Sequence, residues 1–79
     1  MERLKTEKHV VGLKQSVRAV NEGEALLAFV ARDADYHVVF PFENLCREKN
    51  IQIEYVNNMK ELGKACHVEV PTAVAVLLR

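Results

Sequence analysis

The chain of 79 residues has little of what small secreted scaffolds, collagen-like chains and membrane spans require. It has two cysteines, two prolines, three glycines and no tryptophan. Two cysteines do not make a disulfide framework, and so few prolines and glycines argue against long loops. No N-terminal leader-like segment or apolar run of membrane length is visible. We therefore expect a cytoplasmic chain with reduced thiols and no membrane association.

Net charge is also missing, because 11 basic residues balance 11 acidic ones. This balance argues against a strongly electrostatic nucleic-acid binder of the histone kind. The charge is nevertheless uneven, with a sum of +3 over residues 1–18, −4 over residues 22–54 and +1 over residues 57–79. An anionic partner is therefore expected to meet the N-terminal part of the chain.

What the chain does contain is the composition of a soluble globular protein, 49% hydrophobic and 28% charged. Its length predicts one small domain that spans residues 1–79, and we expect a monomer.

The stretch between Gly12 and Gly23 predicts an amphipathic helix over about residues 13–22. The apolar positions that share one face, and are expected to pack into the core, are Leu13, Val17 and Val20. The polar positions that fan over about 100° of the opposite side are Lys14, Gln15 and Arg18. Gly23 suits a left-handed helix stop, and Gly12 lets backbone come close to a partner. The helix end then suits an anion, although an ordinary surface helix with a solvated polar face explains the same pattern.

The other segments alternate between strand and helix. Residues 1–8 are charged and expected to be frayed, with the start of a first helical turn as the alternative. Strands are expected at residues 9–11, at the apolar run 24–31, at the alternating run 51–56 and at residues 72–78. Helices are expected at residues 36–50, where Pro41 should separate, kink or tighten the first turn, and at residues 59–66 after an Asn58 cap. Alternating strands and helices imply βαβ units and predict an α/β fold with helices on both faces of the sheet.

No constellation of an enzyme is visible in the sequence. Histidines and cysteines are scattered without metal-ligand spacing, so we expect no metal site and no cofactor. Asp33 and Asp35 could bind Mg²⁺ at a strand end, but no nucleophile or phosphate loop accompanies them. Cys46 and Cys66 are interpreted as small core residues. The prediction is a protein that is not an enzyme.

Four sequence blocks, in this order and at this spacing, resemble the L7Ae/L30e family of kink-turn RNA-binding ribosomal proteins. The similarity is greatest to its short bacterial members, the YbxF type, and extends over about residues 10–78. The blocks are Gly12-x-Lys14-Gln15-x-x-Arg18-x-Val20-x-x-Gly23, Ala31-x-Asp33-Ala34-Asp35, Leu62-Gly63-Lys64-Ala65-Cys66 and Val68-Glu69-Val70.

The resemblance implies a three-layer α/β/α sandwich with a small mixed sheet of three to four strands, and binding to kink-turn RNA. In that RNA a three-nucleotide bulge next to tandem sheared G·A pairs bends the backbone. The family's Asn-Glu-x-x-Lys positions fall on Lys14, Gln15 and Arg18. Lys14 and Gln15 can donate to the O6/N7 edge of guanine, and Arg18 can bind phosphate. The kink opens a groove that regular A-form RNA keeps too narrow for side chains, and Gly12 lets the helix approach.

The resemblance also implies a second contact, the loop of residues 67–71. Val68 and Val70, on either side of Glu69, could cover a flipped-out base, or they could simply cap the sheet. Lys64 is a further cation expected to face the RNA. Asp35 lies where some relatives have an acidic residue facing the loop nucleotide, and a helix N-cap is an equal alternative for it.

Four positions depart from the family pattern. Gln15 replaces the usual Glu, and His67 stands where a Gly is usual. Met59 and Val70 stand where some relatives carry a Lys and an Arg, so two backbone contacts are missing. These departures predict weaker or more selective binding, to ribosomal RNA, a riboswitch or another structured RNA. The alternative function is a ribosome-associated or protein-interaction domain of the same fold with weak RNA affinity.

Overall fold

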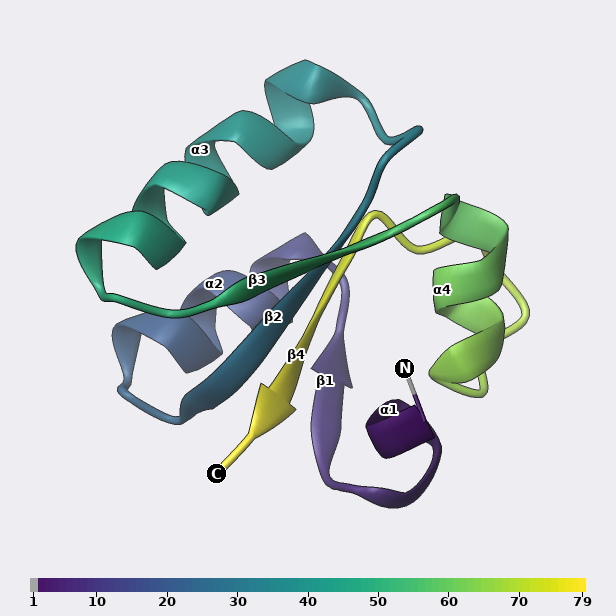
Figure 1. Ribbon diagram of the computed structural model, residues 1–79, viewed down its shortest axis with the longest axis horizontal. Coiled ribbons are helices and arrows are strands. Elements are labelled where there is room, and N and C mark those ends of the chain that lie inside the picture. The colour runs from purple at the N-terminus through teal and green to yellow at the C-terminus, as the bar shows by residue number, and fades with distance from the viewer. Residues whose placement is uncertain (1) are drawn as a thin grey trace.

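The computed structural model describes residues 2–79, so Met1 lies outside the described part. Helices and strands alternate along the chain for most of its length (Figure 1). In chain order the elements are α1 (Glu2–Thr6), β1 (His9–Val11), α2 (Leu13–Asn21), β2 (Ala25–Ala31), α3 (Tyr36–Glu48), β3 (Ile53–Val56), α4 (Met59–Ala65) and β4 (Val74–Leu78).

The four strands form one mixed sheet in the order β1-β4-β2-β3. β4 pairs antiparallel with both β1 and β2, whereas β2 and β3 are parallel and joined through α3. The sequence implied repeated βαβ units, and the structure forms one, β2-α3-β3, because the C-terminal strand inserts antiparallel between β1 and β2. The predicted small mixed sheet is confirmed.

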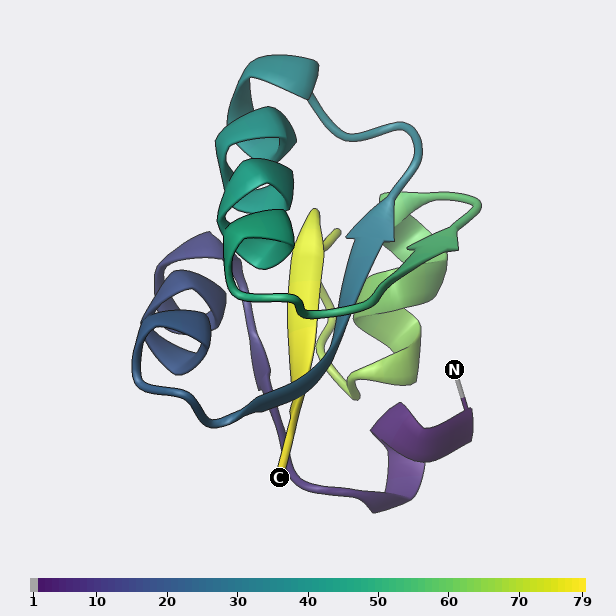
Figure 2. The ribbon, with the colours of Figure 1, turned by 60° about the vertical axis from the view of Figure 1, so that its left-hand side comes forward.

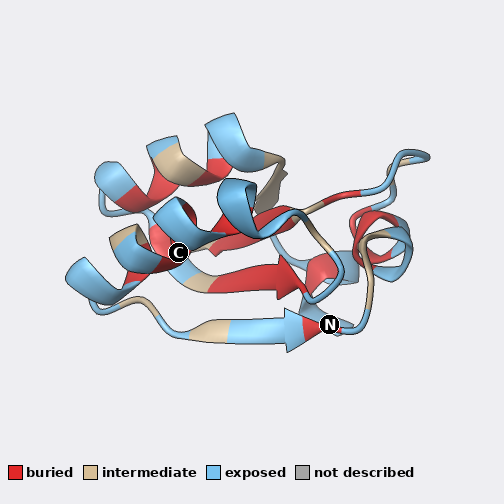
Figure 3. Ribbon diagram, turned by 90° about the horizontal axis from the view of Figure 1, so that it is seen from above, coloured by how far each residue is buried: buried red, intermediate tan, exposed pale blue. Residues whose placement is uncertain are grey.

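Two helices cover each face of the sheet, as Figure 2 shows with α2 and α3 on one side and α1 and α4 on the other. The core is correspondingly divided between the α2/α3 face and the α1/α4 face. Successive residues of β2 supply the two halves in turn, because neighbouring strand side chains point to opposite faces. Ala28 and Val30 belong to the first half, and Phe29 and Ala31 to the second. The predicted three-layer α/β/α sandwich is confirmed, and Figure 3 shows the buried residues gathered on the strands and inner helix faces.

Burial of α2 differs in one position from the sequence prediction. Its buried residues are Ser16, Ala19 and Val20, and Val17 is half-buried at their edge. Leu13, which was expected in the core, is 38% exposed. The helix is therefore rotated so that the small Ser16 side chain faces the sheet, and the first turn is lifted toward solvent.

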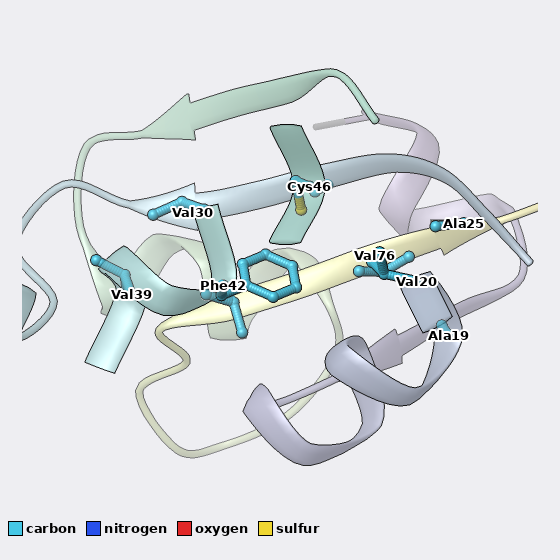
Figure 4. Packing of buried hydrophobic residues seen from close by; sticks show 10 residues of the cluster. Ala19, Val20, Ala25, Val30, Val39, Phe42, Cys46 and Val76 are labelled. Carbon is cyan, nitrogen blue, oxygen red and sulfur yellow. The ribbon is translucent and has the colours of Figure 1, made fainter. Parts of the chain in front are cut away.

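α3 runs as one α-helix through Pro41, so the predicted separate or 3₁₀ first turn is wrong. Proline is tolerated here because it lies near the helix start and is exposed, which leaves a single helical bond unmade. Phe42 and Cys46 are buried toward the sheet, and Figure 4 shows the Phe42 ring over β4, with Val76 further along the same strand.

The N-terminal segment is also more ordered than the sequence predicted. α1 covers Glu2–Thr6, and its Leu4 is fully buried in the α1/α4 half of the core. One apolar residue among charged neighbours gives no periodic signal, so the anchoring of this turn could not be seen in the sequence.

Candidate nucleic-acid interface

Several connections between elements meet at one end of the sheet, at the top of Figure 1. β1 and β2 end there and β4 begins there, since the Gly12 amide donates to the Val74 carbonyl at 3.0 Å and the Ala31 amide to the Ala73 carbonyl at 2.9 Å. The chain after β2 and the start of α4 meet at the same end, where the Met59 amide donates to Asp33 Oδ1 at 2.8 Å. The first turn of α2, the β2–α3 connection and the approach to β4 are thus held together.

Gly12 has a backbone conformation that suits glycine, with φ +91° and ψ 161°. A Cβ atom at this position would meet nothing within 4 Å, so the requirement comes from the backbone and the space above it is open. Within residues 2–79 no side chain caps α2, so the amide groups of its first turn remain available to an acceptor. The N-terminal end of α2 is therefore open to the close approach of a partner, as expected from Gly12.

The three polar residues of α2 are all exposed, as the helical spacing predicted: Lys14, Gln15 and Arg18. Arg18 Nε lies 3.3 Å from Glu22 Oε2, and the two side chains are 72% and 50% exposed. Lys14 takes part in no ion pair with residues 2–79. Lys14 is therefore the freer cation of the two, and the Glu22 carboxylate partly neutralises Arg18.

The loop of residues 67–71 is fixed to α4 by backbone contacts. The amide of Val68 donates to the Gly63 carbonyl at 3.0 Å and that of His67 to the Lys64 carbonyl at 3.1 Å. This bonding pattern requires a left-handed residue after the helix, and His67 takes that role with φ +63°. A histidine thus holds a backbone conformation that favours glycine, at the position that the sequence analysis noted as one where a Gly is usual in the family.

The far end of the same loop rests on α4 as well. The Thr72 amide donates to the Met59 carbonyl at 3.0 Å, and a Cβ atom on Gly63 would overlap the Val70 carbonyl oxygen. Gly63 is thus the point where the loop backbone lies directly against the helix.

Between this loop and α4 lies an open hollow of 390 Å³. Its lining residues are Lys60, Lys64, Val68, Glu69, Val70 and Pro71. Val68 is half-buried against the α1/α4 core, whereas Val70 is 64% exposed and is the valine of this loop that points outward. Sequence reasoning named the two valines, Lys64 and Glu69, and placed Pro71 in the contact loop of residues 67–71, but it missed Lys60. The i, i+4 spacing of Lys60 and Lys64 on α4 was the signal that could have found Lys60.

Asp35 caps α3, since its Oδ1 accepts from the His37 amide at 2.8 Å. The helix-cap interpretation is thereby confirmed, and a role of Asp35 toward a nucleotide stays a prediction. Asp33 accepts from Met59, so each carboxylate is engaged by a different helix start. Among residues 2–79, no three His, Cys, Asp or Glu side chains are grouped as a metal ion would need.

Both cysteines are buried, in agreement with their interpretation as core residues. Burial raises the pKa of the Cys46 thiol from 9.0 to about 11, with the nearby Glu43 carboxylate as a second cause. Burial likewise raises the pKa of Cys66. A thiol that stays protonated is a poor nucleophile, so neither side chain is suited to covalent chemistry.

The predicted residues fall into two groups. Gly12, Lys14, Gln15 and Asp35 lie at the end of the sheet where the connections meet, and Arg18 lies one turn further along α2. Lys64 and the loop of residues 68–70 surround the hollow on α4, which Thr72 and Ala73 join to the sheet end. In the part of the chain that the structure describes, no helix combines the length and apolarity that crossing a bilayer requires.

Comparison with known proteins adds independent information. The profile of the ribosomal protein L7Ae/L30e/S12e/Gadd45 family matches residues 1–79. The RNA-binding protein YbxF of Geobacillus stearothermophilus is 41% identical over 76 residues, and the alignment covers 96% of this chain and 93% of the relative. An RNA-binding protein of Geobacillus sp. strain WCH70 is 42% identical with the same coverage.

The fold agrees with solved structures. The 15.5 kD RNA binding protein of Giardia lamblia superimposes with a TM-score of 0.84 and 32% identity, over 90% of this chain and 60% of that one. A Bacillus halodurans protein described as of unknown function gives a TM-score of 0.82 at 25% identity. The family profile matches the whole sequence, and the bacterial relatives have nearly the same length as this chain. Both findings agree with the mixed sheet between two helical layers. The chain belongs to the ribosomal protein L7Ae/L30e/S12e/Gadd45 family.

Proposed function

We propose that this chain is a non-enzymatic RNA-binding module that recognises kink-turn RNA and stabilises its bent form by selective binding. The support comes from the two bacterial relatives and the Giardia protein, all three described as RNA-binding, and from the exposed residues at the sheet end. The observation that carries the proposal is the hydrogen bond from the Gly12 amide to the Val74 carbonyl. It ties the uncapped first turn of α2 to the strand that follows the loop.

The first turn of α2 is suited to a base edge. Lys14 and Gln15 are exposed next to a glycine whose surroundings are empty, so a base edge can approach the helix backbone. Their amino and amide groups can donate to guanine O6 and N7. The amide oxygen of Gln15 can also accept from guanine amino groups, the task of the Glu usual in the family. Arg18 can bind phosphate, in competition with its contact to Glu22.

The loop is suited to an unstacked base. Val70 is exposed beside Lys60 and Lys64, so an apolar surface is flanked by two cations. Water solvates a base face poorly, and an apolar side chain can cover it while a lysine meets the adjoining phosphate. A fully paired duplex offers no such base, which gives the loop a part in selecting the kinked form.

The test of the proposal is a gel shift with a kink-turn RNA and with a control RNA in which both sheared G·A pairs are replaced by Watson–Crick pairs. Lys14→Ala and Gln15→Ala should each weaken binding to the kink-turn by about 1–3 kcal/mol, the value of a good base-edge contact. Lys49→Ala and Gln52→Ala are matched controls, because both residues are exposed and lie outside the elements at the proposed interface. Equal affinity for the two RNAs, or wild-type affinity in both α2 variants with the helix intact, contradicts the proposal.

The loop is tested separately by Val70→Asp, Val70→Ala and Val70→Thr. The carboxylate of the first variant faces phosphate repulsion, so it should lose more affinity for the kink-turn than the other two. Thermal melting should show all three folded, since Val70 is largely exposed. A loop that only connects α4 to β4 would leave the preference for the kink-turn unchanged in all three.

The chain's formal net charge of zero and the Arg18–Glu22 pair favour a second candidate, a ribosome-associated or protein-interaction domain of this fold with weak RNA affinity. The kink-turn gel shift separates the two, since the second candidate predicts no preference for sheared G·A pairs. We also propose that residues 1–79 act as one domain and as a monomer in the cytoplasm, which size-exclusion chromatography and cell fractionation test.

A further inference from the structure

A second hollow, of 300 Å³, opens between α3 and the β2/β3 edge of the sheet. Four polar or aromatic residues line it: Arg32, Tyr36, Glu43 and Tyr55. The rest of its lining is apolar and comes from Val30, Ala31, Ala34 and Val39. None of these residues belongs to the α2 surface or the α4 hollow, so this is a different surface of the molecule.

Glu43 is the unusual member, because a carboxylate is rarely placed in a core without a partner. Its residue is 8% exposed, on the face of α3 that also buries Phe42 and Cys46. The Tyr55 hydroxyl donates to Oε2 of Glu43, while Oε1 has no hydrogen-bond partner in residues 2–79. Oε1 and the second lone pair of Oε2 are therefore left to accept from whatever enters the hollow.

The phenol of Tyr55 is a fixed donor in this arrangement. Its hydrogen bond to the Glu43 carboxylate raises the pKa of Tyr55, because a phenolate would face a second negative charge. The Tyr55 hydroxyl therefore keeps its proton and its donor role toward Glu43.

The rim of the hollow offers flat surfaces and one cation. Tyr36 is 60% exposed and its ring packs on Phe40, with ring centres 5.0 Å apart. The Arg32 guanidinium lies 5.4 Å from the centre of the Tyr55 ring. Aromatic rings and guanidinium planes are the surfaces on which unpaired bases stack. The Arg32 charge also disfavours a cationic occupant, such as an arginine or lysine of another protein, and favours a ligand that carries phosphate.

We propose that this hollow binds a guanine base, with its N1–H and N2–H₂ donors on the Glu43 carboxylate, its face on Tyr36 and its phosphate at Arg32. Guanine is the base whose Watson–Crick edge presents two adjacent donors. Adenine and cytosine present one amino donor beside a ring acceptor, and in uracil a single N–H stands between two carbonyl oxygens that a carboxylate repels. The expected order of affinity is guanine first, adenine and cytosine next, and uracil last.

Two sources can supply such a base, an unpaired guanosine in bound RNA or a free guanine mononucleotide. The segment from Arg32 to Tyr36 lines the hollow and contains Asp35, which lies at the sheet end proposed above to meet RNA, so the two surfaces adjoin along the chain. The base site itself does not depend on kink-turn recognition, because its residues are separate from Lys14, Gln15 and the loop.

The experiment is an NMR titration of the full chain with GMP, AMP and arginine amide, followed through the ring signals of Tyr36 and Tyr55. GMP should bind on the order of tenfold more tightly than AMP, as for one discriminating base-edge contact, and arginine amide should not bind. Glu43→Gln should weaken GMP binding about tenfold and remove the preference over AMP. Tyr36→Ala should weaken both nucleotides alike, since stacking does not distinguish them.

Glu48→Gln, an exposed change at the end of the same helix, is the matched control and should bind GMP as the wild type does. If Glu43→Gln does not fold, the exposed Tyr36→Ala variant still tests the site. Equal affinity for GMP and AMP, unchanged binding in Tyr36→Ala, or binding of arginine amide in place of GMP overturns the proposal. A competition experiment with kink-turn RNA then separates the two sources. If RNA supplies the base, GMP should compete with an RNA that carries an unpaired guanosine and not with an RNA that lacks one. If the free nucleotide is the natural occupant, GMP and either RNA should bind to the protein at the same time.

Discussion

Replacement of Gly63 by alanine tests how tightly the loop is set against α4. The new methyl group would overlap the carbonyl oxygen of Val70 and lie 3.2 Å from Thr72 Oγ1, so the loop backbone must retreat. Overpacking of this kind typically destabilises a protein by about 1–3 kcal/mol. Alanine regains about 0.8–1 kcal/mol in helix propensity, which leaves a net loss of roughly 0–2 kcal/mol. In a domain of this size, 1 kcal/mol lowers the melting temperature by about 4–8 °C.

The larger consequence should be on binding, because the loop that carries Val70 moves. Melting followed by circular dichroism gives the stability, and the kink-turn gel shift gives the affinity. Lys64→Ala, next along the helix and exposed, is the control, since it should lose a phosphate contact without moving the loop. A Gly63→Ala protein that is more stable than the wild type by the full propensity gain, and binds RNA equally well, would refute the close contact between loop and helix.

Three further changes follow from named contacts. Glu22→Gln frees Arg18 from an exposed i, i+4 pair worth about 0.3–0.5 kcal/mol, so melting should hardly change while RNA affinity, measured by titration at low salt, rises. Gly12→Ala should destabilise by about 1–3 kcal/mol in urea unfolding, because the backbone there is one that essentially only glycine adopts, although nothing blocks the methyl group. The folded-state pKa of Cys46 is raised from 9.0 to about 11, so the stability it contributes is complete below pH 9 and is lost as the pH rises toward 11. The free energy of unfolding should therefore fall more steeply between pH 9 and pH 11 in the wild type than in Cys46→Ala, and equal slopes would exclude this linkage.

Much of the fold could be predicted because its signals are local. The nearly unbroken apolar run of residues 24–31 is typical of a strand covered on both faces, and the Asn58 side chain accepts from the Glu61 amide as its spacing indicates. The errors at Leu13 and Leu4 have a common cause, since both residues were judged by their own neighbours in the sequence. Whether an apolar side chain at a helix end is buried depends on which other element packs against it, and the helical spacing of apolar residues does not contain that information.

The same limit applies to the candidate surfaces. Exposure of Lys14 and Gln15 follows from helix geometry alone, and the structure agrees. Lys60 was missed because it lines the hollow only where the loop of residues 67–71 folds back over α4. Glu43 was missed because a carboxylate on a helix is normally solvated, and its partner Tyr55 comes from a strand on the other side of a turn.

With no net charge, this chain cannot draw RNA by a uniform positive field, and selectivity has to come from positions that the fold fixes. Gly12 and His67 are backbone positions held in conformations that a mobile connector would not keep, and each is bonded to a neighbouring element. Gly63 brings the loop onto its helix at a distance that no larger residue permits. The few cations at the proposed interface have fixed positions, Lys14 on α2 and Lys60 and Lys64 on α4. An RNA that binds there must therefore place its phosphates next to these side chains. Under the kink-turn recognition proposed above, a regular duplex cannot bring its phosphates to these places whereas a sharply bent backbone can, so a protein of 79 residues without net charge would select the RNA by its shape.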